Sequence, residues 1–244
     1  GDTVTIFGTT AGTTFQIGDD GIADNFNVEI SETSAAFIQN TFDALVIGDT
    51  TDQIGSINID DSNADDTLTL NTGLTLRQLD AGAGEINILS SITTDGDFTV
   101  SGSRSSFNIN GSTTINTTAD SDNVQINDTI VFVNEGDDLA LLTGGGSVEL
   151  LGNVTANNTT ARGEDITITA GTGTVTFGRS GGSDAFGGSG NDRLGDIDIV
   201  SSGNLMVHAT VTAGQFIQQT GGGGTRTSTF NAALNLDDGT AADD

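Results

Sequence analysis

The sequence of 244 residues contains no cysteine, lysine, proline, tryptophan or tyrosine, and only one histidine. Without cysteine, the chain has no disulfide, no thiolate nucleophile and no cysteine-based zinc site. Without lysine, it has no amine for Schiff-base catalysis and no phosphate-binding lysine of the P-loop kind. The missing residue types therefore exclude a large part of covalent and metal-dependent catalysis.

Positive charge is scarce as well. Six basic residues, all of them arginine, face 34 acidic residues, which gives a formal net charge of -28 and a pI near 4.1. Nucleic acid is not expected as a partner, because phosphate binding needs clustered cations. The longest apolar runs, such as residues 130–133, are far shorter than the roughly 20 residues of a membrane span. We therefore expect no membrane insertion.

Apolar residues alternate with polar ones along much of the chain. This period of two is typical of a strand with one buried face. A content of 34% hydrophobic residues with this net charge would also suit a disordered chain. The alternation of apolar and polar residues recurs along the sequence, however, and this predicts a folded chain. No stretch of 12 residues keeps the apolar stripe of a helix, so we predict an all-β protein. The alternating sets are Val4/Ile6, Phe26/Val28/Ile30, Leu68/Leu70, Leu74/Leu76, Ile86/Ile88, Phe98/Val100, Phe107/Ile109, Ile166/Ile168, Val175/Phe177, Ile197/Ile199 and Leu234/Leu236.

A degenerate repeat marks the start of several of these strands. It consists of glycine, an acidic or small polar residue, and an apolar-polar-apolar triplet. Copies begin at Gly55, Gly84, Gly96 and Gly195, and copies with one inserted residue begin at Gly136 and Gly163. The spacing between copies is irregular, which indicates short strands separated by turns and by loops of variable length.

Three all-β architectures could use many short strands: tandem immunoglobulin-like sandwiches, a closed barrel, or a parallel β-solenoid. Sandwiches usually carry a buried tryptophan or a tyrosine corner, and neither residue type is present. Short strands and turns rich in glycine, asparagine, aspartate and threonine favour the solenoid. We predict one β-solenoid segment over residues 1–244, with rungs of about 20 to 25 residues, roughly 10 to 12 rungs in all, and a length of about 50 to 60 Å.

A family is also suggested by three stretches of the sequence. They are residues 91–100 (SITTDGDFTV), 163–178 (GEDITITAGTGTVTFG) and 194–205 (LGDIDIVSSGNL). They resemble the β-strand repeats of filamentous-haemagglutinin-like giant bacterial surface proteins, and the resemblance is densest from residue 55 onward. It implies a right-handed parallel β-helix that serves as an extracellular stalk, fibre or adhesin. The family has no catalytic motif to match. Because the sequence has no secretion domain, anchor or signal peptide, we expect it to be an internal piece of a longer repetitive protein.

Residues 187–195 (GGSGNDRLG) fit the calcium-binding nonapeptide pattern G-G-x-G-x-D-x-U-x. Glycines let backbone carbonyl groups turn toward an ion, and an aspartate supplies a carboxylate. Gly188, Gly190 and Asp192 are therefore the candidate calcium site, and calcium is the only candidate cofactor. The alternative is a flexible glycine loop between two strands. The other acidic clusters lack the spacing of an EF-hand loop and are interpreted as solvated turns.

No constellation of catalytic residues is evident. His208 is the only histidine and lies in a strand-like stretch, out of phase with Leu205 and Val207, so we expect it to face solvent and to form neither a triad nor a metal site. The six arginines are scattered from Arg77 to Arg226, whereas enzymes that act on acidic sugars concentrate basic groups. We therefore predict that the protein is not an enzyme.

The function expected from the sequence is a structural or adhesive segment of a secreted bacterial cell-surface fibre, acting as a stiff acidic rod outside the cell. Its expected partners are copies of itself or adjacent repeats. Two alternatives remain: a carbohydrate- or cell-binding adhesin module whose specificity lies in the glycine-rich loops 180–191 and 221–225, and a β-helix polysaccharide lyase or hydrolase. The absence of tyrosine and tryptophan weighs against sugar binding, because sugar rings usually stack on aromatic side chains.

Overall fold

The computed structural model describes residues 2–8, 12–18, 28–31, 34, 42–48, 55–60, 67–78, 84–102, 106–118, 121–157, 163–188, 192–219 and 226–236. The described chain is all-β, as predicted, with short strands that pair in parallel. No helix in these ranges is long and apolar enough to cross a membrane. All the alternating sets lie in strands, except that Phe26 is outside the described residues.

The strands form three faces around a shared core. A nine-stranded sheet makes the first face, in the order β1 (Thr3–Ile6), β4 (Ala44–Gly48), β7 (Gly73–Gln78), β10 (Phe98–Gly102), β13 (Val124–Ile126), β16 (Val148–Leu150), β19 (Val175–Phe177), β22 (Leu205–Val207) and β24 (Ser228–Phe230).

A second sheet of 16 strands makes the other two faces. The second face comprises β3 (Val28–Ile30), β2 (Phe15–Ile17), β5 (Ile57–Ile59), β8 (Ile86–Ile88), β11 (Ser106–Ile109), β14 (Thr129–Phe132), β17 (Val154–Thr155), β20 (Ala185–Phe186), the first part of β23 (Thr210–Gln218), and β25 (Leu234–Leu236). The third face comprises β6 (Thr67–Leu70), β9 (Ser91–Thr94), β12 (Thr113–Asn116), β15 (Leu139–Leu142), β18 (Ile166–Thr169), β21 (Leu194–Ser201) and the last part of β23.

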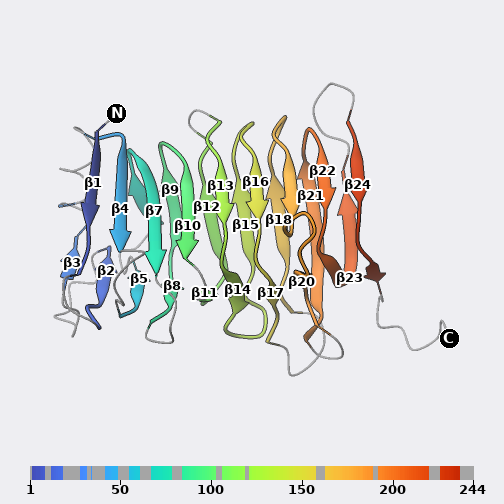
Figure 1. Cartoon of the computed structure of the whole chain (residues 1–244), viewed down its shortest axis with the longest axis horizontal. Helices are drawn as coiled ribbons and strands as arrows, with labels where there is room; N and C mark the ends of the chain where they lie inside the picture. Colours follow the sequence, from blue (N-terminus) through green and yellow to red (C-terminus); the bar gives the residue numbers. More distant parts are fainter. Residues whose placement is uncertain are drawn as a thin grey trace.

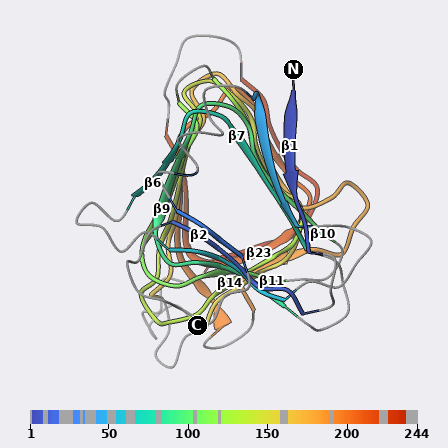
Figure 2. The ribbon, with the colours of Figure 1, turned by 90° about the vertical axis from the view of Figure 1, so that its left-hand side faces the viewer.

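From β4 to β20, each strand pairs with the strand that lies three further along the chain. One turn therefore visits the first, second and third faces in order, and the next turn stacks on it in parallel register. Viewed from the end, the faces enclose a triangular outline (Figure 2). Viewed from the side, successive turns follow one another from β1 to β24 (Figure 1). The arrangement is consistent with a β-solenoid.

The core consists of apolar residues stacked on their equivalents one turn away. In strands such as β8, β13 and β18, the apolar residues of the alternating pattern are buried and the polar residues between them are more exposed. Because pairing is in register, identical or similar side chains pack along the long axis. One such column on the first face is fully buried and comprises Leu45, Leu74, Phe98, Val124, Val148, Val175 and Leu205.

Glycine is required where the backbones of successive turns approach closely. At the corner between the third and first faces, a Cβ atom on Gly173 would collide with the carbonyl oxygen of Gly146, and one on Gly203 would collide with that of Thr172. Glycine at this corner therefore permits the stacking distance of a parallel sheet, about 4.8 Å.

Three details differ from the prediction. Paired residues on successive turns are from 19 positions apart (Leu194 and Ala213) to 42 positions apart (Phe15 and Ile57), so the turns vary more than predicted and many are longer. Among the described residues the first face has nine strands, and its eight steps of ~4.8 Å span about 40 Å, compared with the 50 to 60 Å predicted. Strand β3 also breaks the regular order, since it pairs with β2 at the edge of the second face.

Candidate functional site

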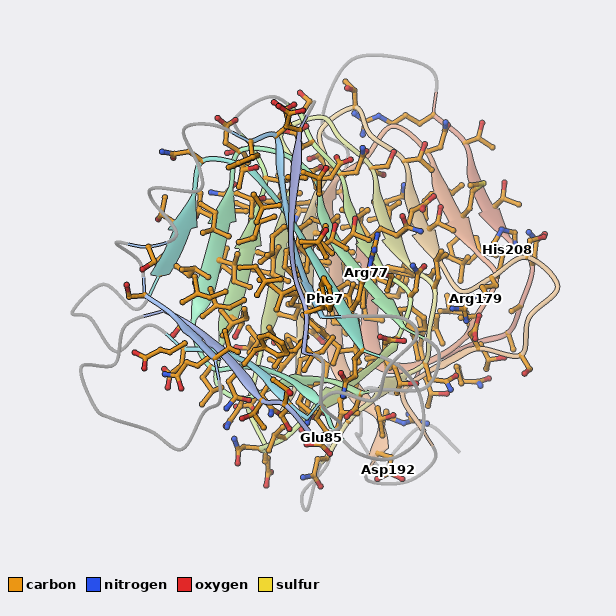
Figure 3. All side chains as sticks on the ribbon, turned by 60° about the vertical axis from the view of Figure 1, so that its left-hand side comes forward. Phe7, Arg77, Glu85, Arg179, Asp192 and His208 are labelled. Atoms are coloured by element: carbon orange, nitrogen blue, oxygen red, sulfur yellow. The ribbon has the colours of Figure 1, made fainter. Side chains whose placement is uncertain are left out.

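The loop predicted to bind calcium lies between β20 and β21. Gly190 is outside the described residues, so only Gly188 and Asp192 can be placed. The backbone N–H of Gly188 donates a hydrogen bond of 2.6 Å to the carbonyl oxygen of Asp192. A Cβ atom on Gly188 would lie 2.8 Å from the Cβ of Asp192, so this close turn requires glycine. Asp192 is exposed at the outer edge of the molecule (Figure 3).

The placed part of this loop thus offers one solvent-facing carboxylate beside a tight glycine turn. Within the described ranges, no group of three or more acidic or histidine side chains is arranged to hold a metal ion. Calcium binding at Gly188, Gly190 and Asp192 stays a prediction.

A ladder of side chains runs along the corner where the chain enters the first face. Each side-chain oxygen accepts a hydrogen bond from the backbone N–H of the equivalent residue one turn later. Asp97 accepts from Asn123 at 2.8 Å, and Asn123 accepts from Ser147 at 2.8 Å. Ser147 in turn accepts from Thr174 at 3.3 Å. Backbone donors at the turn are satisfied in this way, which ties successive turns together.

A second ladder, at the entrance to the third face, is acidic. The Oγ of Ser112 donates to the Oδ2 of Asp138 at 3.4 Å, and the Oδ1 of Asp138 accepts the backbone N–H of Asp165 at 3.1 Å. The Oδ1 of Asp165 then accepts the backbone N–H of Asp196 at 2.6 Å. We call Ser112, Asp138, Asp165 and Asp196 the acidic ladder.

The acidic ladder places like charges on successive turns. Burial raises the pKa of the Asp165 carboxyl above its ordinary value of 3.8, and the neighbouring charges of Asp138 and Asp196 raise it further, against the lowering effect of the Asp196 backbone hydrogen bond. Asp165 therefore combines a favourable hydrogen bond with an unfavourable electrostatic position.

A third ladder consists of amide side chains on the outer surface of the second face. The Nδ2 of Asn87 donates to the Oδ1 of Asn58 at 2.9 Å, and the Nδ2 of Asn108 donates to the Oδ1 of Asn87 at 2.9 Å. Asn108 also donates to the Oε2 of Glu85 at 2.9 Å. Stacked amides of this kind reinforce parallel, in-register strands.

A polar pocket of about 330 Å³ opens at the corner between the first and second faces. The Nη2 of Arg179 donates to the carbonyl oxygen of Asn127 at 2.7 Å, so the guanidinium reaches past the adjacent turn to the one beyond it. Its Nη1 lies 3.7 Å from the Oδ1 of Asp184, whose Oδ2 accepts the backbone N–H of Arg179 at 2.7 Å. The pocket is lined by Gly102, Asn127, Asp128, Thr129, Gly152, Asn153, Arg179 and Asp184.

This pocket presents both hydrogen-bond donors and hydrogen-bond acceptors. The half-exposed Arg179 offers donors, and the carboxylates and amides around it offer acceptors. Asp184 belongs to the loop 180–191 that the sequence singled out for recognition. The other such loop, 221–225, lies outside the described residues.

His208 lies in the turn after β22 and is partly exposed, as predicted. Its Nδ1 is 3.1 Å from the Nδ2 of Asn231, so it has a neighbour that the sequence did not predict. Figure 3 shows His208, Arg179 and Asp192 on the ribbon.

Sequence reasoning missed the ladders, although it found the motif that carries them. The polar residue after glycine in the repeat is the ladder residue, as at Asp97 and Asp196. The variant copies with one inserted residue supply Asp138 and Asp165. The polar residue immediately before the apolar-polar-apolar triplet is therefore the sequence signal that could have found these ladders.

Comparisons with family models, with curated proteins and with solved structures find no match for this chain.

Proposed function

We propose that this chain is a right-handed parallel β-helix that acts as a stiff, acidic structural or adhesive segment of a secreted bacterial surface protein. The observation that carries the proposal is the parallel pairing of each strand from β4 to β20 with the third strand after it. The path of the chain in Figure 2 supports the right hand. From β7 the chain passes to the second face and then to β9, which is a clockwise path, while it moves away from the viewer.

The stiffness of the rod follows from contacts that run along its axis. Backbone hydrogen bonds link every described turn to the next, and the ladders add side-chain links at the corners and on the second face. The net charge of -28 gives the flanks a like-charged surface, which opposes lateral aggregation. A rod with a continuous core and repulsive flanks suits a spacer or a fibre segment.

The location outside the cell rests on sequence features. The absence of cysteine and lysine, the low pI and the resemblance to repeats of bacterial surface proteins all favour an extracellular site. The partners we propose are adjacent repeats or further copies of this chain. We propose no catalytic role, because the polar side chains of the ladders are engaged in cross-turn hydrogen bonds.

The experiment is electron microscopy of the purified chain, with circular dichroism on the same samples. The proposal predicts uniform rods or filaments and a strand-rich spectrum. Compact globular particles or a disordered spectrum would contradict it. Uronic-acid polymers incubated with the protein should keep their length, and chain scission would instead support the lyase alternative.

Calcium is tested in the same samples. If the loop binds calcium, isothermal titration with CaCl₂ gives a saturable signal that Asp192→Asn removes, because the variant lacks the carboxylate. Asp184→Asn, in the same loop, is the matched control and should keep the signal. A titration that is identical in the parent and in Asp192→Asn would exclude this loop.

A second candidate function, binding of a sugar residue, is favoured by the Arg179 pocket. Its volume lies within the range of small-ligand sites, at the low end, and its donors and acceptors suit hydroxyl groups. A glycan array probed with the parent chain tests this function. Arg179→Gln should abolish any signal that comes from the pocket, whereas Arg77→Gln, on the first face, should not. Equal loss in both variants would point to nonspecific charge effects.

A further inference from the structure

The only Asn-Gly dipeptide of the sequence, Asn110-Gly111, lies at the corner between the second and third faces. It directly follows β11, and the side chain of Asn110 is exposed. Gly111 has a φ of +103°, and a Cβ atom built on it would meet nothing within 4 Å. The space beside the Gly111 backbone is therefore open, and no side chain of its own shields the nitrogen.

An exposed asparagine followed by glycine is chemically labile, because the backbone nitrogen of the glycine can attack the side-chain amide. The Gly111 nitrogen loses its proton and forms a bond to the Cγ of Asn110. The Cγ–Nδ2 bond breaks, and Nδ2 takes up a proton and leaves as ammonia. Water then opens the succinimide ring at either carbonyl, which gives aspartate or its β-linked isomer. The reaction consumes one water molecule and adds one carboxylate to the chain.

Both reacting groups are held by side chains of the next turn. The backbone N–H of Gly111 donates a hydrogen bond of 2.9 Å to the Oδ1 of Asp137. The Nδ2 of Asn134 donates to the Oδ1 of Asn110 at 2.8 Å. The next turn thus contacts the nucleophile, which is the Gly111 nitrogen, and the carbonyl oxygen of the group that it attacks. We call Asn110, Gly111, Asn134 and Asp137 the corner clasp.

Asp137 determines how the two amide side chains are oriented. Its Oδ2 accepts the backbone N–H of Asn134 at 2.8 Å and the Nδ2 of Asn134 at 3.2 Å. A carboxylate only accepts hydrogen bonds, so the atom of Asn134 that faces it is the nitrogen. The atom of Asn110 that contacts the same nitrogen is therefore the oxygen. Asp137 is also buried, so the corner clasp is a fixed arrangement.

We propose that Asn110 is a deamidation site whose rate is set by the contact between two successive turns. While the corner clasp is closed, Asn134 and Asp137 restrain both reacting groups, and the reaction is slow. When the two turns separate at this corner, both groups are released, and the reaction proceeds at the rate of an unfolded Asn-Gly. The site requires only the stacking of adjacent turns, so it does not depend on the proposed role at a bacterial surface.

The charge of Asp137 restrains the nucleophile. Attack requires the Gly111 nitrogen to become negative, and a carboxylate within hydrogen-bonding distance opposes a second negative charge. The hydrogen bond adds to this effect, because it stabilises the neutral N–H. A nearby like charge displaces an ionisation equilibrium by roughly tenfold or more. We therefore expect the closed clasp to slow the reaction by about tenfold or more.

Asn134 restrains the group that is attacked. Ring closure requires the Cγ of Asn110 to approach the Gly111 nitrogen with its carbonyl correctly aligned. The hydrogen bond from Asn134 holds the amide oxygen against the next turn, which restricts the rotation that brings Cγ into line. The two restraints act on different atoms of the reaction, so we expect loss of either one to raise the rate.

The product weakens the contact that restrains the reaction. Deamidation places a new carboxylate close to the buried carboxylate of Asp137, and like charges at such a distance repel. The β-linked isomer also adds one methylene group to the backbone between β11 and β12. The ammonia that leaves is not recovered. A separation of turns at this corner is therefore recorded as a covalent change that does not reverse.

Peptide mass spectrometry of the full chain, incubated at neutral pH for increasing times, measures deamidation at Asn110. The folded parent should deamidate about tenfold or more slowly than the parent in urea above its unfolding midpoint, where the clasp is absent. Asp137→Ala should deamidate about tenfold faster than the folded parent, because the charge and the acceptor are both removed. Asp137→Asn keeps one acceptor without the charge, so its increase should be smaller.

Asp138→Ala is the matched control. Asp138 is the next residue in the chain, but its hydrogen bonds join Ser112 and Asp165 in the acidic ladder. Its removal should leave the rate at Asn110 unchanged. Urea midpoints of all variants separate loss of the clasp from loss of the fold. Asn134→Ala, at an exposed position, opens the clasp in a second way and should also raise the rate if Asp137→Ala does not fold.

The outcomes are decisive in each direction. Equal rates at Asn110 in the folded parent and in the folded clasp variants would overturn the proposal, because the next turn would then not set the rate. A folded parent that deamidates as fast as the parent in urea would overturn it as well. An absence of deamidation in urea would exclude Asn110 as a modification site.

Discussion

The ring of Phe216 lies between those of Phe177 and Phe230, in edge-to-face contact with both, at centroid distances of 6.2 and 5.9 Å. Phe216 is partly buried, whereas Phe230 is 45% exposed. We predict that Phe216→Ala lowers the free energy of unfolding by about 2 kcal/mol, because it leaves a cavity and removes two ring contacts. Urea unfolding followed by circular dichroism measures this loss.

Phe230→Ala is the matched variant. At protein concentrations where the chain is monomeric, it should lower the free energy of unfolding by less than about 1 kcal/mol, because nearly half of the side chain is already in water. Equal losses in the two variants would mean that Phe230 is more buried than the structure shows.

The acidic ladder predicts how stability depends on pH. The pKa of Asp165 is raised in the folded chain, so its protonated form is favoured by folding. This contribution to stability is fully present below the ordinary pKa and is lost as pH rises through the raised pKa. Asp165→Asn keeps an Oδ1 acceptor for Asp196 without the charge. The variant should be more stable than the parent at pH 7, and the difference should shrink as pH falls through the raised pKa and be smallest below the ordinary value of 3.8.

Asp165→Ala separates the hydrogen bond from the charge. It removes the acceptor for the backbone N–H of Asp196 and should cost about 1 kcal/mol relative to Asp165→Asn at every pH. Urea midpoints at pH 3.5 and pH 7 provide both comparisons. A parent that is more stable than Asp165→Asn at pH 7 would show that the charge is favourable.

Much of the fold could be predicted from the sequence because it rests on local, repeated signals. Alternation such as Ile197-Asp198-Ile199 identifies a strand and its buried face, and Gly195 before it lies close to the start of that strand, which begins at Leu194. Two features could not be predicted. The pairing of β3 with β2 and the length of β23 depend on contacts between distant segments. No repeating pattern in the sequence indicates these contacts.

The candidate sites were less predictable than the strands. The Arg179 pocket joins Asn127 to a guanidinium 52 residues later, and nothing in the local sequence of either residue indicates that contact. The exposure of Leu234 and Leu236 was also not predicted, because their alternation matches that of buried strands. Whether an alternating strand is covered depends on the presence of a further turn.

The close approach of successive turns at the corner between the third and first faces gives a prediction about glycine. A Cβ on Gly173 would collide with the carbonyl oxygen of Gly146, so Gly173→Ala should cost about 2 to 3 kcal/mol by forcing neighbouring turns apart. Gly181→Ala is the control, since its Cβ would meet nothing within 4 Å and its φ of +76° costs only about 1 to 2 kcal/mol. Urea midpoints in the reverse order would argue against tight stacking at this corner.

The asparagine ladder gives a prediction for the second face. Asn87→Ala removes one donor and one acceptor and leaves Asn58 and Asn108 without their ladder contacts, so it should cost about 1 to 2 kcal/mol. Thr75→Ala, at an outward position of the first face, should cost less than about 0.5 kcal/mol. Thermal melts of the two variants and the parent provide the comparison. No difference between the two variants would show that the ladder contributes little.

The central claim is that each turn stacks on the next in the stated register, and paired cysteines test it most directly in a chain that has none of its own. Thr99 lies opposite Gln125 on the adjacent turn, and Gln125 lies opposite Glu149 on the turn after that. Adjacent strands are about 4.8 Å apart, within reach of a disulfide, whereas strands two turns apart are at about twice that distance. Mild oxidation followed by mass spectrometry should show an intramolecular disulfide in Thr99→Cys/Gln125→Cys and none in Thr99→Cys/Glu149→Cys. A disulfide in the second variant but not in the first would contradict the register and with it the parallel β-helix.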